Sequence, residues 1–337
     1  CVACCLALLL PYVGPGQRPV VLFDARRRAE GAGRQEQRGV RDRRACGAGA
    51  VSAFYASRVA SLGPPMAGLL FALPFGPSAS AGQCVTERVN LTHTGSQASL
   101  EGAALGLSAD GRHVVFHSAD PTLVPGDTNG TWDIFLRDLV AGSTERVSVG
   151  SGGTQAQGLS SGGGVSSDGR YVGFGSSAVN LVPGDTNGVD DVFAHDRSTQ
   201  VTTRVSVSSS GAEGNLASFF WGISGDARFV VFSSRSSTLV PGDTNGKTDI
   251  FVQDRERGET TRVSVGSAGA EADAHCGEPK ISHDGGYVVF VSAATTLVPG
   301  VGGAGQVFLH ARATGQTEIA SLTSQGTVPT TSSGWPT

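Results

Sequence analysis

The chain has 337 residues, of which 49 are glycine and only 16% are charged. Residues 1–65 hold ten Arg and four acidic residues, a net charge of +6, and the remainder holds 15 basic and 25 acidic residues, a net charge of −10. This acidic body argues against nucleic acid as a partner, because binding to a phosphate backbone depends on neutralisation by Lys and Arg. Many turn residues and few charges favour a fold of many short strands.

Residues 1–65 precede Met66, the only methionine, and they lack hydrophobic periodicity. Their cluster of arginines, from Arg26 to Arg44, has the composition of a nucleic-acid-binding arm. We instead favour a disordered extension or translated upstream DNA, because the segment begins at Cys1 and shows no pattern of a folded domain.

A short apolar run, residues 66–81, follows and ends in Ala79-Ser80-Ala81. An apolar segment followed by small residues is typical of a secretory signal peptide. The segment lacks a positive charge after Met66, and a start at Val51 would supply Arg58. The alternative is a short buried apolar segment. No run reaches the ~20 apolar residues that a membrane-spanning helix needs, so we expect a secreted or periplasmic protein without a membrane span.

The chain after residue 84 is repetitive. Residues 123–135 return as 181–193 and 239–251, each 58 residues after the last, and an eroded fourth copy covers 297–308. Self-similarity at a fixed period indicates an architecture in which neighbouring units bury one another. We therefore place one repeat domain at residues 84–326 and a tail at 327–337.

Four strands are predicted in each unit. Alternating apolar and polar residues predict an outer strand, which occurs first as Thr86–Leu91 and then at 144–149, 203–207, 261–265 and 317–321. An inner strand ends in Ser-x-Asp, as in Ser108–Asp110, and in three copies Gly follows, which favours a tight hairpin. Two apolar strands complete the unit and begin at His113 and Asp133 in the first copy.

These strands predict an all-β fold, a β-propeller of four-stranded antiparallel blades. Val114 and Phe116 point to one side of their strand and Val115 to the other. Because both sides are apolar, each sheet has to lie between two neighbours, as blades do. Four complete units plus an orphan N-terminal strand leave two alternatives: the chain stops short of a fuller propeller, or one of two equivalent outer strands is displaced.

The motif Ser166-Ser-Asp-Gly-Arg-Tyr-Val172 and the Asp-Val/Ile-Phe strands that end in Asp138, Asp196 and Asp254 resemble the TolB-type, WD-like bacterial β-propeller repeat. The resemblance covers residues 84 to about 326. It implies a secreted or periplasmic propeller that is used mostly for protein interactions. The 58-residue units are longer than the ~40–45 residues usual for such blades, and the excess lies in two loops of each unit.

One of these loops contains candidate calcium ligands at relative positions one, three and seven. They are Asp127, Asn129 and Asp133, then Asp185, Asn187 and Asp191, then Asp243, Asn245 and Asp249. The spacing looks like the calcium loops of integrin-type propellers, with Pro125, Pro183 or Pro241 in place of the first Asp. Oxygen ligands of this kind suit calcium, with weak affinity of about 10⁻⁴–10⁻³ M. The alternative is a turn without metal, since Pro, Asp, Asn and Gly all favour turns.

The fourth copy has Val301, Gly303 and Gln306 at these positions, so no site is expected there. Two cysteines, Cys84 and Cys276, belong to the repeat domain. The strand order places them on opposite faces, and we expect both thiols to be unpaired.

A non-repeated aromatic cluster, Phe219-Phe220-Trp221, enters an inner strand near the expected axis. Aromatic side chains there would stack on a sugar or clamp a peptide, or would simply fill the central channel. The sequence therefore gives these residues as candidate ligand-binding residues.

Catalytic motifs give little support for an enzyme. Residues 158–162 match Gly-x-Ser-x-Gly but lack the strand-to-helix turn that this motif requires. We predict a non-catalytic binding or scaffold module for a protein or carbohydrate ligand, stabilised by calcium if the loops bind it. The alternatives are a hydrolase or lyase with an axial site near His275 and Glu278, or the substrate-gating propeller of a peptidase.

Overall fold

The computed structural model describes residues 86–301 and 303–329. The predicted extension, the predicted signal peptide, Cys84 and residues 330–337 of the predicted tail lie outside the described residues. Within the described ranges the chain is all β, and no helix there is long and apolar enough to cross a membrane.

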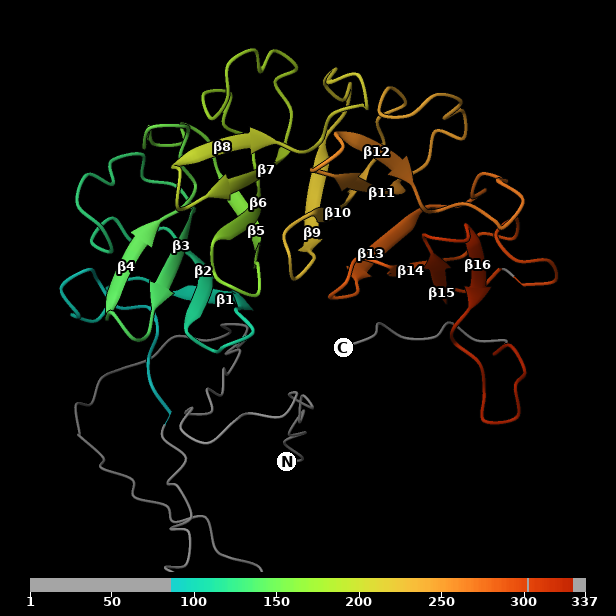
Figure 1. Cartoon of the computed structure of the whole chain (residues 1–337), viewed down its shortest axis with the longest axis horizontal. Helices are drawn as coiled ribbons and strands as arrows, with labels where there is room; N and C mark the ends of the chain where they lie inside the picture. The colour runs from blue at the N-terminus through green and yellow to red at the C-terminus, as the bar shows by residue number, and fades with distance from the viewer. Residues whose placement is uncertain (1–85, 302, 330–337) are drawn as a thin grey trace, which may run out of the picture. The chain divides into compact units, whose positions relative to one another are not determined.

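Sixteen strands form four separate four-stranded sheets, which we call blades 1 to 4 (Figure 1). Blade 1 contains β1 (Gly102–Leu107), β2 (His113–Ser118), β3 (Asp133–Asp138) and β4 (Ser143–Arg146). Blade 2 contains β5 (Ser160–Val165), β6 (Tyr171–Ser176), β7 (Asp191–Asp196) and β8 (Val201–Arg204). Blade 3 contains β9 (Ser218–Ile223), β10 (Phe229–Ser234), β11 (Asp249–Asp254) and β12 (Glu259–Arg262). Blade 4 contains β13 (Cys276–Ile281), β14 (Tyr287–Ser292), β15 (Gln306–Ala311) and β16 (Gln316–Ile319).

All neighbouring strands within a blade are antiparallel and follow chain order. The predicted all-β fold of four-stranded antiparallel blades is therefore confirmed. Each first hairpin turns at the Ser-x-Asp motif, where the Ser108 hydroxyl donates to Asp110 Oδ1 at 2.6 Å and Gly111 has a φ of +70°.

An ion pair fixes the same end of the first three blades. Arg112, which follows the hairpin glycine, donates to both oxygens of Asp138 at the end of β3, and its Nη2 lies 2.7 Å from Oδ2. The pair recurs as Arg170–Asp196 and Arg228–Asp254. Blade 4 has lost both partners, with Gly286 and Ala311 at these places. In blades 1 to 3 the arginine after the Ser-x-Asp hairpin thus ties that hairpin to the third strand.

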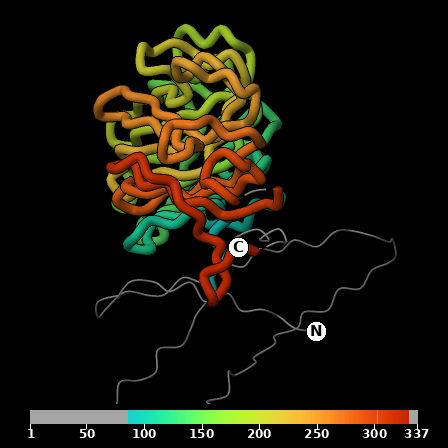
Figure 2. The backbone as a smooth tube through the Cα atoms, turned by 90° about the vertical axis from the view of Figure 1, so that its right-hand side faces the viewer, coloured from blue at the N-terminus to red at the C-terminus, as the bar shows by residue number. Residues whose placement is uncertain are grey.

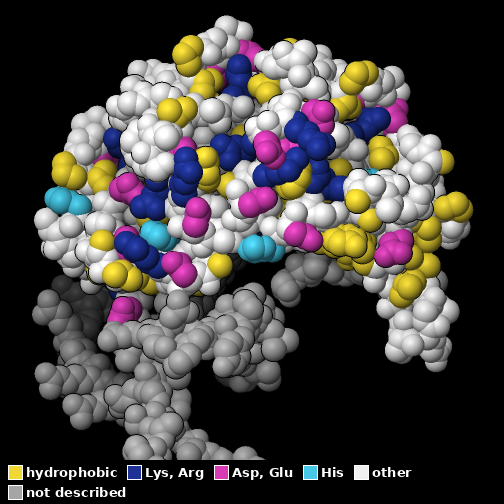
Figure 3. Space-filling model, in the orientation of Figure 1, with side chains coloured by type: hydrophobic (Ala, Val, Ile, Leu, Met, Phe, Trp, Pro, Cys, Tyr) yellow, Lys and Arg dark blue, Asp and Glu magenta, His cyan; other side chains and the backbone are white. Residues whose placement is uncertain are grey.

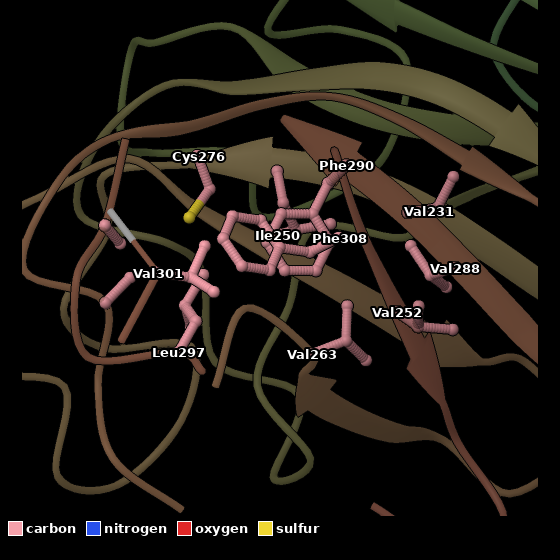
Figure 4. Close-up of a cluster of buried hydrophobic side chains, with 12 residues drawn as sticks. Val231, Ile250, Val252, Val263, Cys276, Val288, Phe290, Leu297, Val301 and Phe308 are labelled. Carbon is pink, nitrogen blue, oxygen red and sulfur yellow. The ribbon is translucent and has the colours of Figure 1, made fainter. Parts of the chain in front are cut away.

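The hydrophobic core lies between blades, where one sheet face packs on the next. Figure 4 shows the interface of blades 3 and 4, in which Val231, Ile250 and Val252 of blade 3 meet Val288, Phe290 and Phe308 of blade 4. In every blade a phenylalanine of the second strand stacks on one of the third, with ring centroids 5.6–5.8 Å apart. Each sheet is thus stabilised by its neighbours, as the apolar character of both strand faces requires.

The four blades follow one another along an arc, with blades 1 and 4 at its two ends (Figure 1). Figure 2 gives a view from the right-hand side of Figure 1, with the orange and red backbone of blade 4 in front. Blade 4 has its own outer strand, β16. The predicted N-terminal strand Thr86–Leu91 is wrong, since this segment joins no sheet and makes only an isolated bridge between Leu91 and Gln97. Its Leu91 carbonyl instead accepts a hydrogen bond from Thr144 Oγ1 of β4 at 2.6 Å.

Candidate functional site

The nine predicted calcium ligands lie in three equivalent loops, which connect the second and third strands of blades 1 to 3. Asp133, Asp191 and Asp249 are the first residues of β3, β7 and β11, and all three are fully buried. The preceding Asp and Asn residues lie on the loops, so each trio converges on the start of the third strand. We call these the Asp-Asn-Asp loops.

Hydrogen bonds within the first loop use every polar group of Asn129. Its Nδ2 donates to Asp133 Oδ2 at 2.8 Å and to the Ala156 carbonyl at 3.0 Å, and its Oδ1 accepts from Thr131 N at 3.1 Å. The other oxygen of Asp133 accepts from Ser148 Oγ at 2.6 Å. Asn187 and Asn245 make the same bonds in blades 2 and 3. The asparagine therefore ties the loop to the third strand and to the connection that leads to the next blade.

An arginine of the outer strand, absent from the predicted site, lies between the two carboxylates of each loop. Arg146 Nη1 is 3.2 Å from Asp127 Oδ1 and 3.7 Å from Asp133 Oδ2. Arg204 and Arg262 stand in the same relation to Asp185 with Asp191 and to Asp243 with Asp249. The guanidinium group thus provides a buried positive charge for the paired carboxylates.

A third acidic or polar side chain comes from the connection between blades. Gln155 Nε2 donates to Asp127 Oδ1 at 2.9 Å. In the next two loops Glu213 and Glu271 take this place, and each accepts hydrogen bonds from both the arginine and the loop. The formal charge of the cluster is therefore −1 in blade 1, with two Asp and one Arg, and −2 in blades 2 and 3, where a Glu is added.

The fourth copy has lost the cation together with the anions. Val301 and Gln306 replace the two aspartates, and Ile319 replaces the arginine, opposite Phe308 as Arg146 is opposite Phe135. Ser321 Oγ still donates to Gln306 Oε1 at 2.7 Å, so a neutral hydrogen bond is kept. Concerted replacement indicates that the two aspartates and the arginine form one electrostatic unit.

Burial dominates the electrostatics of these clusters. It raises the pKa of Asp127 and of Asp133, against the opposing effect of hydrogen bonds and of Arg146. Burial also raises the pKa of Asp243, and the neighbouring Asp249 carboxylate adds to this effect. Arg146 Nη1 makes no hydrogen bond with the described residues, so its interaction with the carboxylates is one of charge.

Calcium would have to share these carboxylates with the buried guanidinium, and the two cations would repel each other. Within residues 86–301 and 303–329, no group of three or more His, Cys, Asp or Glu side chains is arranged to hold a metal ion. Calcium binding by the Asp-Asn-Asp loops stays a prediction. Its test uses Arg204, because removal of this arginine would leave Asp185 and Asp191 without a cation.

The three aromatic candidates separate in the structure. Phe220 is buried and packs on glycines of blade 2, since a Cβ at Gly173 would come within 2.4 Å of its ring. Trp221 packs against the core of blades 3 and 4, and its Nε1 donates to Ser233 Oγ at 2.9 Å. Phe219 is 50% exposed. Of the cluster, Phe219 is therefore the side chain that faces solvent.

Other exposed apolar residues occur at the same level of the fold. Leu100, Leu159 and Leu216 each come shortly before an inner strand, and they are 42–48% exposed. Leu159 adjoins Ser160, whose N–H donates to the Trp132 carbonyl at the end of the first Asp-Asn-Asp loop at 2.8 Å. Ser218, between Leu216 and Phe219, donates in the same way to the Asp190 carbonyl at 2.7 Å. The Leu100 N–H donates to Asp120 Oδ2, which lies in the β2–β3 connection of its own blade, at 2.7 Å. These three leucines and Phe219 therefore lie beside the loops, and we call the four residues the apolar rim.

The axial catalytic site predicted as an alternative involves His275 and Glu278. His275 comes just before β13, and Glu278 lies within it. His275 Nδ1 accepts a hydrogen bond from Thr248 N at 2.9 Å. Glu278 has a φ of +53° at an irregularity of the β13–β14 pairing.

The Gly158–Gly162 stretch runs into β5 rather than into a helix, so it is not a nucleophile turn. Cys276 is buried and free, and burial raises its thiol pKa to about 12.

Four-stranded antiparallel blades that pack face to face define a fold of the β-propeller type. No protein-family model and no curated protein matches the chain. Among solved structures it is similar to TolB from Acinetobacter baumannii, with 19% identity, a TM-score of 0.41, and coverage of 67% of this chain and 44% of that one. A putative TolB from Agrobacterium tumefaciens has 17% identity, a TM-score of 0.43, and coverage of 67% and 64%.

The β-propeller domain of the Trilobed protease from Pyrococcus furiosus is also similar, with 11% identity and a TM-score of 0.39. The match covers 66% of this chain and 57% of that domain. The chain thus spans less than two thirds of the length of each of these structures.

Proposed function

We propose that this protein is an exported, non-catalytic β-propeller that binds a protein or carbohydrate ligand at the apolar rim. The observation that carries this proposal is the exposure of Leu100, Leu159, Leu216 and Phe219 beside the Asp-Asn-Asp loops. Exposed apolar side chains beside polar groups recur here on three neighbouring blades, and exposed apolar surface rimmed by polar groups is typical of interaction sites. An accessible phenylalanine suits stacking on a sugar ring or contact with an apolar peptide side chain.

The loops beside the rim supply a rigid polar border. Their buried Arg-centred clusters hold the loop bases, so little conformational freedom is lost when a ligand binds. Calcium is not required in this proposal, because the guanidinium group of Arg146, Arg204 or Arg262 already supplies a cation to the paired carboxylates of each loop. Acidic and basic side chains are interspersed on the face that Figure 3 presents, so this face offers no field of one sign to a polyanion.

Export is supported by the apolar run and small residues of 66–81 and by the resemblance to TolB-type repeats. Fractionation of cells that express the full chain tests this part. We expect the protein outside the cytoplasm and shortened at its N-terminus. Recovery of the full-length chain in the cytoplasm would contradict export.

Ligand binding is tested with immobilised oligosaccharides and with extended peptides that contain apolar residues. Replacing Leu216 with Ser and Phe219 with Ala should weaken binding of the selected probe about tenfold or more, which is ~1.4 kcal/mol or more. Val140→Ser is the matched control, since Val140 is 77% exposed but lies in the turn after β3. Equal weakening by the control, or none by the double variant, would contradict the rim as the binding site.

The enzymatic alternative makes a different prediction. A hydrolase or lyase with an axial site would lose turnover in His275→Ala, whereas a binding module shows no turnover to lose. Detection of turnover that His275→Ala abolishes would therefore replace the non-catalytic proposal.

A further inference from the structure

Blade 4 has one sheet face that no other blade covers among the described residues. Burial alternates along β14 and β15, so that every second residue is accessible, whereas all of β11 is buried. The accessible residues are Tyr287, Val289, Val291, Val307, Leu309 and Ala311, which we call the open face. Val289 pairs with Leu309, and Val291 pairs with Val307. Contiguous accessible apolar side chains normally mark an interaction surface, so this apolar face indicates a partner.

The internal interfaces show what covers this kind of face. Val115, Ile134 and Leu136 of blade 1 pack against a core of blade 2 that contains Phe174 and Phe193. In blade 4, the positions of these three aliphatic residues are held by Val289, Val307 and Leu309. The open face is therefore the half of an interface that, in blades 1 to 3, receives the next blade.

Blade 1 carries the complementary half. Its cluster contains Phe116 and Phe135 with Ala98 and Leu123, the counterparts of Phe174, Phe193, Ala156 and Leu181. Among the described residues, no aliphatic trio from a preceding blade joins this cluster. The first strand is accessible too. Gly102 is exposed, whereas Ser160, Ser218 and Cys276 at the same place in blades 2 to 4 are buried.

A series of backbone hydrogen bonds joins successive blades, and one donor and one acceptor of this series lack a partner at the two ends of the arc. The N–H groups of Ser160, Ser218 and Cys276 donate to carbonyls of the preceding blade at 2.7–2.8 Å. The equivalent donor is Gly102 N and the equivalent acceptor is the Gly305 carbonyl, and neither makes this bond within residues 86–301 and 303–329.

A second series runs near the axis. Ala109 N donates to the Ser167 carbonyl, Ser167 N to that of Gly225, and Gly225 N to that of His283. At the blade 4 end, the His283 N–H has no partner in the part of the chain that the structure describes. At the blade 1 end, the Ala109 carbonyl accepts no hydrogen bond of this series. A joint between blade 4 and blade 1 would pair His283 N with the Ala109 carbonyl and Gly102 N with the Gly305 carbonyl.

Side-chain sizes match across such a joint. Phe220 of blade 3 rests on Gly173 of blade 2, so a large residue faces one without a side chain. Blade 1 has Ala104 at the place of Phe220, and the open face has Val289 at the place of Gly173. A small residue then faces one of medium size, which the same space accommodates.

We propose that the open face of blade 4 docks onto blade 1 of a second copy of this chain, head to tail. The interface has the same form as those already present between blades 1 and 2, 2 and 3, and 3 and 4. It also provides hydrogen-bond partners for the end groups of the two series. Figure 1 shows the two participating blades at opposite ends of the arc, so they are free to join different molecules.

Two equivalent segments meet at this joint. Leu91 and Thr92 lie on blade 1 before Gly95, and Leu322 and Thr323 lie after blade 4 before Gly326, with the same Leu-Thr-x-x-Gly pattern. Thr92 and Thr323 each accept a bond at their Oγ1 from the N–H four residues on, at 3.0 and 3.1 Å. Only one segment can accept the Thr144 hydroxyl bond that Leu91 now accepts. In the joint, therefore, either the Leu91 segment keeps this bond and the Leu322 segment lies elsewhere, or the Leu322 segment replaces the Leu91 segment as acceptor.

Light scattering after size-exclusion chromatography of the full chain tests the proposal across a wide concentration range. The wild type should form a dimer or a longer head-to-tail assembly that dissociates on dilution. Ala104→Phe should be monomeric, because the ring would collide with Val289. Ala104→Phe combined with Val289→Gly should associate again, since it recreates the pair formed by Phe220 and Gly173. Val140→Asp, on an exposed turn, is the control and should associate like the wild type.

A wild-type monomer at every concentration would overturn the proposal. Assembly that is unchanged by Ala104→Phe and by Val289→Asp would overturn it as well. If the double variant stays monomeric with a melting temperature equal to that of the wild type, Ala104 and Val289 do not meet, and the joint is refuted.

Discussion

Arg204 reaches from the last residue of β8 to the first residue of β7, with its Nη1 atom 3.3 Å from Oδ2 of Asp191. The Arg204 side chain is 9% exposed and that of Asp191 is fully buried. Removal of either partner of this ion pair leaves an uncompensated charge in a poorly solvated place. The loop above this pair is therefore held by electrostatics as well as by turn-forming residues.

The phenylalanine pairs should dominate the stability of each blade interface. Phe232→Ala removes a fully buried ring that stacks on Phe251 at 5.6 Å, and it should lower the free energy of unfolding by about 3–5 kcal/mol. Phe219→Ala, at a half-exposed position of the same blade, should change it by about 0.5 kcal/mol or less. Urea unfolding of the two variants provides the measurement. Equal losses would contradict the assignment of the core.

Acid should destabilise the blades through the carboxylates that end the third strands. The Arg170 guanidinium holds the pKa of Asp196 well below its usual range, and serine hydrogen bonds add to the effect. A lowered folded-state pKa contributes stability that is present above the unfolded value, near 3.9, and is lost as the pH falls towards the folded value. The midpoint of urea unfolding should therefore fall between about pH 5 and pH 2.

Asp196→Asn should make this pH dependence shallower and should be less stable than the wild type at pH 7. Asp284→Asn is a matched control, because Asp284 bonds only within its hairpin and faces no arginine pair in blade 4. Its own lowered pKa predicts a smaller pH effect, since this carboxylate is exposed to solvent. An unchanged pH profile in Asp196→Asn would show that the ion pair is not what acid disrupts.

Calcium should have little effect on the wild type if the arginines serve as the internal cations. Thermal melting with and without millimolar calcium measures this, and we expect no shift of the melting temperature. Arg204→Met should then acquire a calcium-dependent shift, because Asp185, Asp191 and Glu213 would lack their cation. A wild-type shift that is lost when Asp127, Asp185 and Asp243 are all changed to Ala would establish the predicted calcium sites instead.

Much of the fold follows from patterns that the sequence displays within a few residues. Alternation in β2 and β3, the Ser-x-Asp hairpins and the 58-residue period were enough to predict stacked four-stranded sheets. Thr86–Leu91 has the same local pattern as β4 but does not join a sheet, because strand formation depends on a neighbour as well as on alternation.

The candidate site was only half visible in the sequence. Asp127, Asn129 and Asp133 stand close together in the chain, whereas Arg146 enters through strand pairing, opposite Phe135 on β3. The signal available was that the arginine recurs with the aspartates and disappears with them at Ile319. The sequence also indicated Phe220 as a candidate for ligand contact. Its glycine partners belong to another blade, and this proximity is a tertiary feature that the sequence does not display.

The stability of two variants of blade 2 tests the coupled Arg-Asp-Asp unit most directly. Arg204→Ile alone should lose about 3–5 kcal/mol of unfolding free energy, because two buried carboxylates lose their cation. The triple variant with Asp185→Val, Asp191→Gln and Arg204→Ile copies the blade 4 residues at these three positions. It leaves only Glu213, which still accepts hydrogen bonds from Thr186, without the arginine, so it should be clearly more stable than the single variant. If the triple variant is as unstable as Arg204→Ile or less stable, the guanidinium is not the internal cation of these loops.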